Sequence, residues 1–154
     1  MNEMDVRIVE LPRMRMASAW AFSDSPEIAA WELLHSWAEP LGYLTKSEPP
    51  RIFGYNNPNP SPGSPNYGYE YWMTIDENTP VAGDLRIHEF GGGMYAVTRC
   101  IGIPAITQTW KQLVVWLQKS KYRKAHHQWL EEHISPCGTP FDQFVIDLYL
   151  PITE

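Results

Sequence analysis

The sequence has little cysteine, few clustered basic residues and no long apolar run. Its 154 residues include two cysteines, Cys100 and Cys137, whose spacing fits neither a disulfide framework nor a zinc site. No segment approaches the roughly 18 apolar residues that a membrane span needs. The N-terminus carries acidic residues and lacks the apolar core of a signal peptide, so we expect a cytoplasmic protein.

The charge balance excludes a nucleic-acid footprint. The formal net charge is −6, and the largest basic group is KSKYRK, Lys119–Lys124. Binding to DNA or RNA needs a basic face, so we expect no direct nucleic-acid partner.

Cofactor and metal motifs are also missing. The glycines at 91–93 stand in neither a dinucleotide-binding nor a Walker motif and predict a connection between two strands. His126, His127, Glu131 and His133 do not complete a metal-binding spacing such as HExxH. We therefore expect no metal, no cofactor and no nucleophilic triad.

What is present is a globular composition rich in aromatic residues. The chain is 44% hydrophobic and 19% charged, and its length fits one domain spanning residues 1–154. Aromatic residues make up 13%, with seven Trp and eight Tyr. That is more indole than a core of this size needs, so some rings could line a ligand site while the others pack in the core.

An internal repeat is the strongest signal in the sequence. A shift of 79 residues aligns DVRIVEL (5–11) with DLRIHEF (84–90). The same shift matches five further pairs: Ala17 with Ala96, Trp31 with Trp110, Leu34 with Leu113, Trp37 with Trp116, and Tyr43 with Tyr122. Tryptophan is rare, so two coincidences in one register indicate a duplicated fold with pseudo-repeats 5–79 and 84–152.

Local patterns predict the elements of each repeat. Segments 5–11, 15–22 and 94–101 are typical of strands. A helix is expected after Ser25 as N-cap and Pro26 at its first position, with an apolar stripe formed by Ile28, Trp31, Leu34 and Trp37. A second helix follows Pro104, with the stripe Ile106, Trp110, Leu113, Val114 and Leu117. Each half thus gives strand, strand, helix, strand, strand, which predicts an α+β fold with a mostly antiparallel sheet.

Two further strands alternate clearly. After a loop at 56–66, YGYEYWMTID places Tyr67, Tyr69, Tyr71 and Met73 on one face and Glu70, Trp72 and Thr74 on the other. Near the end of the chain, Val145, Asp147 and Tyr149 share one face, and Ile146, Leu148 and Leu150 share the other.

The stretch QWLEEHISP (128–136) raises a question of its own. Two acids at a helix C-terminus would oppose the helix dipole. A shift of 78 residues places Phe53–Pro58, which is strand-like, on Glu131–Pro136, so we predict a strand here too. Glu131 would then point inward on one face with Trp129 and His133, and Glu132 would be its exposed neighbour.

Several of these segments together resemble the GyrI-like family. They are GGGMYAVTRCIGIPAITQTWKQLVVWLQKSKY (91–122), IDLYLPI (146–152) and YGYEYWMTID (67–76). The resemblance covers nearly the whole chain. This family includes the effector-binding domains of AraC-type and multidrug-responsive bacterial transcription regulators, built from two strand–helix–strand–strand units.

The resemblance implies a small-molecule pocket in a cleft between the two units. The ligands would be hydrophobic aromatic compounds, cationic ones among them, held between aromatic walls and a buried glutamate. Glu131 matches the pocket glutamate, and His133 takes the place of a tyrosine two residues later. Trp110 and Tyr149 match pocket aromatics, with Tyr55, Tyr69 and Tyr71 as weaker candidates.

Within this resemblance we expect a standalone binding module, because strand patterning leaves no room for a helix-turn-helix. Two alternatives stay open. One is a hydrolase of cyclopropane-containing compounds that uses Glu131 as general base or nucleophile. The other is a factor that binds and inhibits gyrase. The sequence does not identify a regulator partner for such a module.

Overall fold

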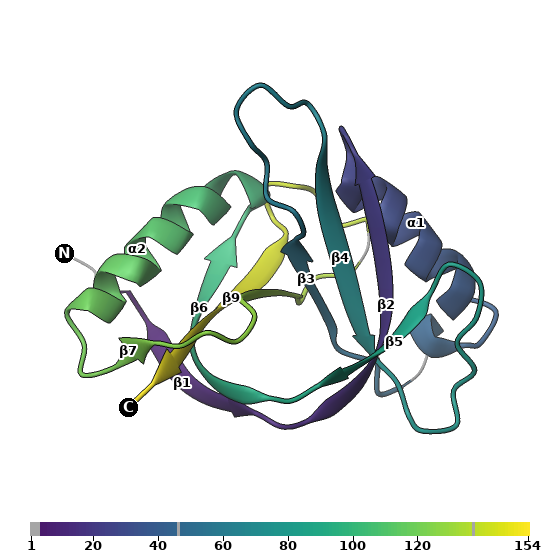
Figure 1. Ribbon diagram of the computed structural model, residues 1–154, viewed down its shortest axis with the longest axis horizontal. Coiled ribbons are helices and arrows are strands. Elements are labelled where there is room, and N and C mark those ends of the chain that lie inside the picture. Colours follow the sequence, from purple (N-terminus) through teal and green to yellow (C-terminus); the bar gives the residue numbers. More distant parts are fainter. Residues whose placement is uncertain (1–3, 46, 137) are drawn as a thin grey trace. The chain divides into compact units, whose positions relative to one another are not determined.

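The structure is a computed structural model that describes residues 4–45, 47–136 and 138–154 (Figure 1). The fold is α+β, as expected, and every strand pairing reported below is antiparallel. The helices are α1 (Pro26–Ala38) and α2 (Ile106–Gln118), with short 3-10 turns at Tyr43–Thr45 and Ile103–Ala105. The strands are β1 (Val6–Leu11), β2 (Met14–Ser23), β3 (Ile52–Asn56), β4 (Tyr67–Thr74), β5 (Arg86–Phe90), β6 (Gly93–Ile101), β7 (Arg123–Lys124), β8 (Leu130–His133) and β9 (Val145–Thr153).

The chain forms two compact units. Unit 1 comprises Met1–Pro12 and Gly91–Glu154, and unit 2 comprises Arg13–Phe90. In unit 1 the strand order is β1-β6-β9-β8, with β7 also paired to β9; in unit 2 it is β3-β4-β2-β5. The first strand of each sequence half therefore pairs with the second strand of the other half: β1 with β6, and β5 with β2.

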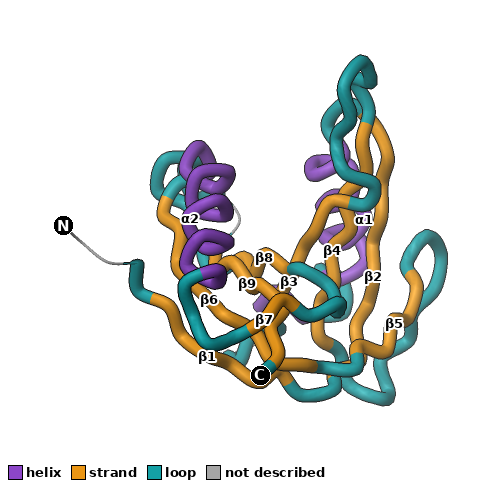
Figure 2. Tube along the Cα trace, turned by 60° about the vertical axis from the view of Figure 1, so that its left-hand side comes forward, coloured by secondary structure: helices purple, strands orange, loops and turns teal. Residues whose placement is uncertain are grey.

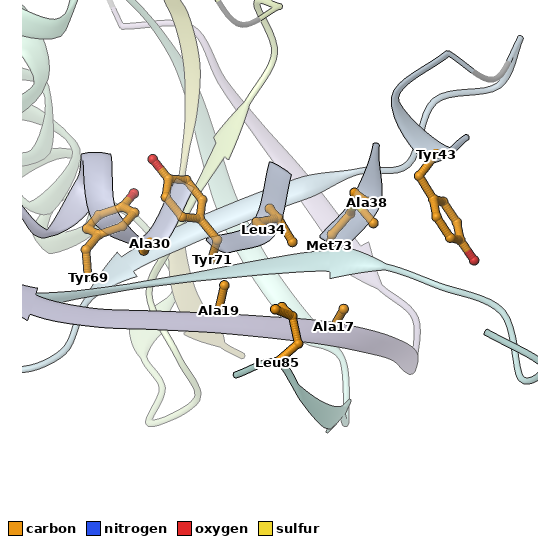
Figure 3. Packing of buried hydrophobic residues seen from close by; sticks show 10 residues of the cluster. All are labelled: Ala17, Ala19, Ala30, Leu34, Ala38, Tyr43, Tyr69, Tyr71, Met73 and Leu85. Atoms are coloured by element: carbon orange, nitrogen blue, oxygen red, sulfur yellow. The ribbon is translucent and has the colours of Figure 1, made fainter. Parts of the chain in front are cut away.

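The core of unit 2 lies between α1 and its sheet (Figure 3). Small residues at the contact, Ala17 and Ala19 on β2 and Ala30 on α1, let the helix approach the strands closely. The buried stripe of α1 is Pro26, Ala30, Leu34 and Ala38. The predicted stripe is wrong at Ile28, which is 64% exposed, because the helix buries small residues four apart and not the larger ones three apart.

The core of unit 1 lies between α2 and β6 and β9, and Figure 2 shows each helix in purple beside strands in orange. The second predicted stripe is confirmed. Leu113 and Leu117 are buried, and Ile106, Trp110 and Val114 pack around them. The predicted alternation of the last strand is also confirmed, since Ile146, Leu148 and Leu150 face this core.

Two further observations concern membrane-spanning helices and cysteine residues. Within the described ranges, no helix is long and apolar enough to cross a membrane. Cys100 is a free, buried thiol, whereas Cys137 lies outside the described residues.

Candidate functional site

In each unit the helix covers one face of the sheet, and the opposite face carries carboxylates among aromatic rings. In unit 1, Ala96, Leu148 and Leu150 pack toward α2. Side chains alternate along a strand, so Asp147 and Tyr149 point to the other face. We refer to the face away from the helix as the carboxylate face of each unit.

The strand predicted at Glu131 is confirmed as β8, and its two acids lie on opposite faces. Glu131 lies on the α2 side, where the indole Nε1 of Trp110 donates a hydrogen bond to its Oε2 at 3.2 Å. Glu132 lies on the carboxylate face, directly opposite Asp147 of β9. The expectation that Glu132 is exposed was wrong: it is 8% exposed, because β8 is covered on both faces and not on one.

Tyr149 holds the buried carboxylate of Glu132. The Tyr149 hydroxyl donates to Glu132 Oε1 at 2.6 Å, a short bond typical of a charged acceptor. The ring of Tyr95 meets Tyr149 edge-on, with centroids 5.5 Å apart. Burial raises the pKa of Tyr95, so this hydroxyl stays protonated and donates to the Gln128 carbonyl.

Asp147, the neighbour of Glu132, is neutralised by two arginines. Arg7 Nη2 donates to Asp147 Oδ2 at 2.9 Å, and Arg99 donates through Nε at 2.9 Å and Nη2 at 3.2 Å. Asp147 is 3% exposed, whereas about half of each arginine side chain is open to solvent. The hydrogen bonds and then the charge of Asp147 raise the pKa of Arg99.

The carboxylate face of unit 2 holds Glu70, which neutral groups surround. Its Oε2 accepts hydrogen bonds from Ser18 Oγ at 2.7 Å and Trp72 Nε1 at 2.7 Å. Its Oε1 accepts one from Asn57 Nδ2 at 3.1 Å. Among the described residues, no ion pair involves Glu70.

Aromatic rings pack around this carboxylate. The Trp72 indole stacks on His88, with centroids 4.2 Å apart and planes at 16°. Tyr55 meets Trp72 edge-on at 4.9 Å, and Phe90 packs beside Trp72 at 5.6 Å. Burial, and after it the negative charge of Glu70, raises the pKa of Tyr55, which keeps this phenol neutral.

The residues expected to form the site fall on different faces. Trp110, Glu131 and His133 lie on the α2 side of unit 1, and Tyr149 lies on its carboxylate face. In unit 2, Tyr55 shares the carboxylate face with Glu70, whereas Tyr69 and Tyr71 are buried toward α1. The structure therefore brings together Trp110 with Glu131, and separates both from Tyr149.

His133 is not a cationic residue near neutral pH. Burial lowers its pKa to about 4, although the nearby charge of Glu132 acts in the opposite direction. Its ring meets Phe144 edge-on at 5.6 Å. Over the described parts of the chain, no group of three or more His, Cys, Asp or Glu side chains could hold a metal ion.

The sequence did not predict a site role for Glu132, Glu70 or Trp72, which the structure places beside aromatic rings on the carboxylate faces. The alternation of the strand at 67–74 already placed Glu70 and Trp72 on one face, but that face could equally have been solvated. The signal that could have identified them is a carboxylate between aromatic residues on a strand whose other face is also apolar.

The comparisons with known proteins bear on the fold. A family model described as Cass2, integron-associated effector binding protein, matches residues 7–152. The chain belongs to this family. The match confirms the resemblance to GyrI-like domains, and it spans both units. No protein of curated function matches the chain.

Solved structures share the architecture at low sequence identity. The C-terminal domain of EcmrR aligns with a TM-score of 0.74 and 11% identity, over 98% of this chain and 98% of that one. A hydrolase from Listeria innocua aligns at 0.73 with 10% identity, over 99% and 94%. SAV2435, solved bound to tetraphenylphosphonium, aligns at 0.61 with 12% identity, over 97% and 94%. These likenesses establish the fold of this effector-binding protein.

Proposed function

We propose that this effector-binding protein binds small hydrophobic aromatic compounds, including cationic ones, and that Glu132 is the buried carboxylate of its binding site. The observation that carries the proposal is the position of Glu132. It is 8% exposed on a sheet face with two tyrosines, and Tyr149 holds it with a 2.6 Å hydrogen bond.

Burial of a carboxylate costs free energy unless hydrogen bonds or charges compensate it. Here Tyr149 supplies one donor and fixes the orientation of the carboxylate. A bound cation would add charge compensation, and nearby rings would add a cation–π attraction of roughly 0.5–2 kcal/mol each. Glu131, the candidate from the sequence, is less suited because its partner is Trp110 on the helix side.

Membership of an effector-binding family supports the binding of small molecules. Tetraphenylphosphonium, bound by SAV2435, is a suitable probe because it is both aromatic and cationic. We therefore suggest a titration of tetraphenylphosphonium, and of the neutral analogue triphenylphosphine oxide, followed by the quenching of tryptophan fluorescence.

Adjacent glutamates on β8 give a matched pair of variants. Glu132→Gln should weaken tetraphenylphosphonium binding by about tenfold or more, since it removes the charge on the carboxylate face. Glu131→Gln removes the same charge from the opposite face and should change the affinity less than about twofold. If the two variants exchange these effects, Glu131 is the ligand carboxylate and the assignment of Glu132 is wrong.

A second candidate function, hydrolysis, uses the same two residues. Glu132 and the Tyr149 hydroxyl lie within hydrogen-bond reach and could serve as general base and proton donor. The likeness to a Listeria innocua hydrolase is one of fold. Incubation with a reactive cyclopropane compound and mass spectrometry of the mixture would test this function. A product that forms with the wild type but not with Glu132→Gln would establish it, and an unchanged substrate would leave binding alone.

A further inference from the structure

The two carboxylate faces can be superimposed through the repeat. Ala17 of β2 and Ala96 of β6 are repeat partners, and each pairs with the last strand that comes after the helix in its half: Ala17 with Met73 of β4, and Ala96 with Leu150 of β9. Three residues further along the strand, Trp20 pairs with Glu70, and Arg99 pairs with Asp147. Glu70 and Asp147 thus occupy equivalent positions, and so do Trp20 and Arg99.

The residue opposite each carboxylate decides whether a charged side chain of the same unit compensates the carboxylate charge. In unit 1 that residue is Arg99, which forms two hydrogen bonds with Asp147, and Arg7 adds a third. In unit 2 it is Trp20, an indole without charge. Directly opposite residues of an antiparallel pair lie on the same side with neighbouring side chains. An aromatic ring therefore stands beside Glu70 where an internal cation stands beside Asp147.

Hydrogen bonding at Glu70 limits the kind of cation it could take. A carboxylate has about four acceptor positions, two on each oxygen. Ser18 and Trp72 fill both positions on Oε2, Asn57 fills one on Oε1, and Tyr55 is a further hydrogen-bond partner of this carboxylate. The carboxylate is well supplied with donors, but those donors are neutral. No cation of the described residues pairs with it, while its lone pairs are largely used.

We propose that unit 2 carries a binding site at Glu70 for a small quaternary ammonium group. Such a cation has no N–H to donate, so it needs charge and aromatic faces and not free acceptors. It would compensate the charge of Glu70 as the Arg99 guanidinium compensates that of Asp147 in unit 1, with the Trp20 ring beside it. The site uses residues of unit 2 alone, so it goes beyond the proposed role of Glu132 and is tested without it.

Trp20 would form the outer wall of this site. It is 49% exposed and stacks with Phe22, which is also 49% exposed, at 6.4 Å between centroids. Its Nε1 donates to the Asn57 carbonyl at 2.7 Å, which holds the indole in place. Asn57 reaches this position because Gly68 has no side chain: a Cβ there would collide with the Asn57 carbonyl. Asn57 thus orients Trp20 through its carbonyl and Glu70 through its amide.

The test compares choline with its neutral isostere 3,3-dimethylbutan-1-ol on the full chain, by tryptophan fluorescence and by NMR of the indole N–H signals. Choline should bind at least about tenfold more tightly than the isostere, since the two differ in the charge. The indole signals of Trp20 and Trp72 should shift. Equal affinity for the two compounds would overturn the proposal.

Three variants locate the site. Glu70→Gln should weaken choline binding about tenfold or more, whereas Glu32→Gln, which removes a charge from an exposed position of α1, should leave it unchanged. Trp20→Arg should abolish binding while Glu70 is still present, because it introduces the internal cation of unit 1. Trp20→Leu removes the ring alone and should weaken binding about twofold to tenfold.

Trp20 is half exposed, so its variants should fold even where Glu70→Gln does not. Choline binding that survives Trp20→Arg in a folded protein would overturn the proposal. Because the Glu132 site is tested with tetraphenylphosphonium and Glu132→Gln, either proposal can fail while the other stands.

Discussion

The two units place a carboxylate at the same point of the same fold and satisfy it by opposite means. In unit 1, Asp147 receives three hydrogen bonds from two arginines. In unit 2, Glu70 receives three from a serine, an asparagine and a tryptophan. Both are hydrogen-bonded, but only the first has cationic partners among the described residues.

This difference shows how, in a duplicated fold, one copy of a carboxylate position can contribute to stability while the other keeps its charge for a ligand. Charged partners on a buried acid contribute to stability and leave no charge for a ligand. Neutral partners orient an acid without cancelling its charge. The exchange of one residue, arginine for tryptophan at equivalent positions 99 and 20, accounts for most of the contrast.

The largest effect should come from removing the neutralised acid. Asp147→Ala should lower the free energy of unfolding by about 2–3 kcal/mol, after allowance for the solvent exposure of both arginines. Glu70→Gln should cost about 1 kcal/mol, since its partners are uncharged. Urea unfolding of both variants measures the difference. An equal loss of unfolding free energy in both variants would contradict the proposed difference between charged and neutral partners.

A backbone change should disturb unit 2 alone. Gly68→Ala should destabilise the protein by about 1–3 kcal/mol, because the new Cβ meets the Asn57 carbonyl. Gly91→Ala is the matched control, since nothing lies near its added Cβ. Thermal unfolding and the indole NMR signal of Trp20 should both change in the first variant. An unaltered Trp20 signal would contradict the role given to Asn57.

Acid should weaken unit 1 through His133. The pKa of this imidazole falls from 6.5 to about 4 on folding, so the unfolded chain binds the proton more readily. The associated stability is full above about pH 6.5 and is lost as pH falls toward 4, by on the order of 2 kcal/mol. Strand pairing places Asn56 opposite Tyr69 in unit 2 as it places His133 opposite Ile146 in unit 1, so the predicted register, which set Tyr55 on His133, is wrong by one residue. The equivalent position is therefore Asn56, which does not titrate.

Urea unfolding at pH 7 and pH 4.5 measures this loss, with His133→Phe as the comparison. The variant keeps a ring against Phe144 and should show a smaller difference between the two pH values. If wild type and variant lose the same stability, the titration belongs to other groups.

The smallest effects should come from the bonds that tie each helix to its sheet. Trp110→Phe removes the bond to Glu131 in unit 1, and Tyr67→Phe removes the bonds to Glu27 of α1 in unit 2. Each should cost about 0.5–1.5 kcal/mol. Hydrogen exchange of α1 and α2 should show a loss of protection limited to the helix concerned. A loss spread over both helices would contradict this assignment.

Most of the fold could be predicted because periodicity and repeat register report burial directly. The strand at Glu131 is an example, since the strand-like pattern of its repeat partner decided between helix and strand, although strand pairing matches Tyr55 with Glu132 and not with His133. Ile28 shows the limit: an apolar residue at helical spacing was expected in the core, but the sheet below α1 accepts alanine instead. A stripe of residues three apart and a stripe of residues four apart lie close together on a helix, and only the surface that the helix packs against decides which one is buried.

The candidate site was less predictable for the same reason. Alternation places Glu131 and Glu132 on opposite faces but does not say which face is buried, and β8 is covered on both. Likewise, Tyr69 and Tyr71 were candidates for ligand-binding aromatic residues, but they pack in the core against α1.

The sequence by itself determined the α+β class, the duplication, the second helix stripe and the faces of the last strand. These follow from local periodicity, which the chain carries along its length. Only the tertiary structure decided which acid is buried, and which partners neutralise Asp147 but not Glu70. Those outcomes depend on pairing between strands far apart in the sequence, which sets what lies opposite each carboxylate.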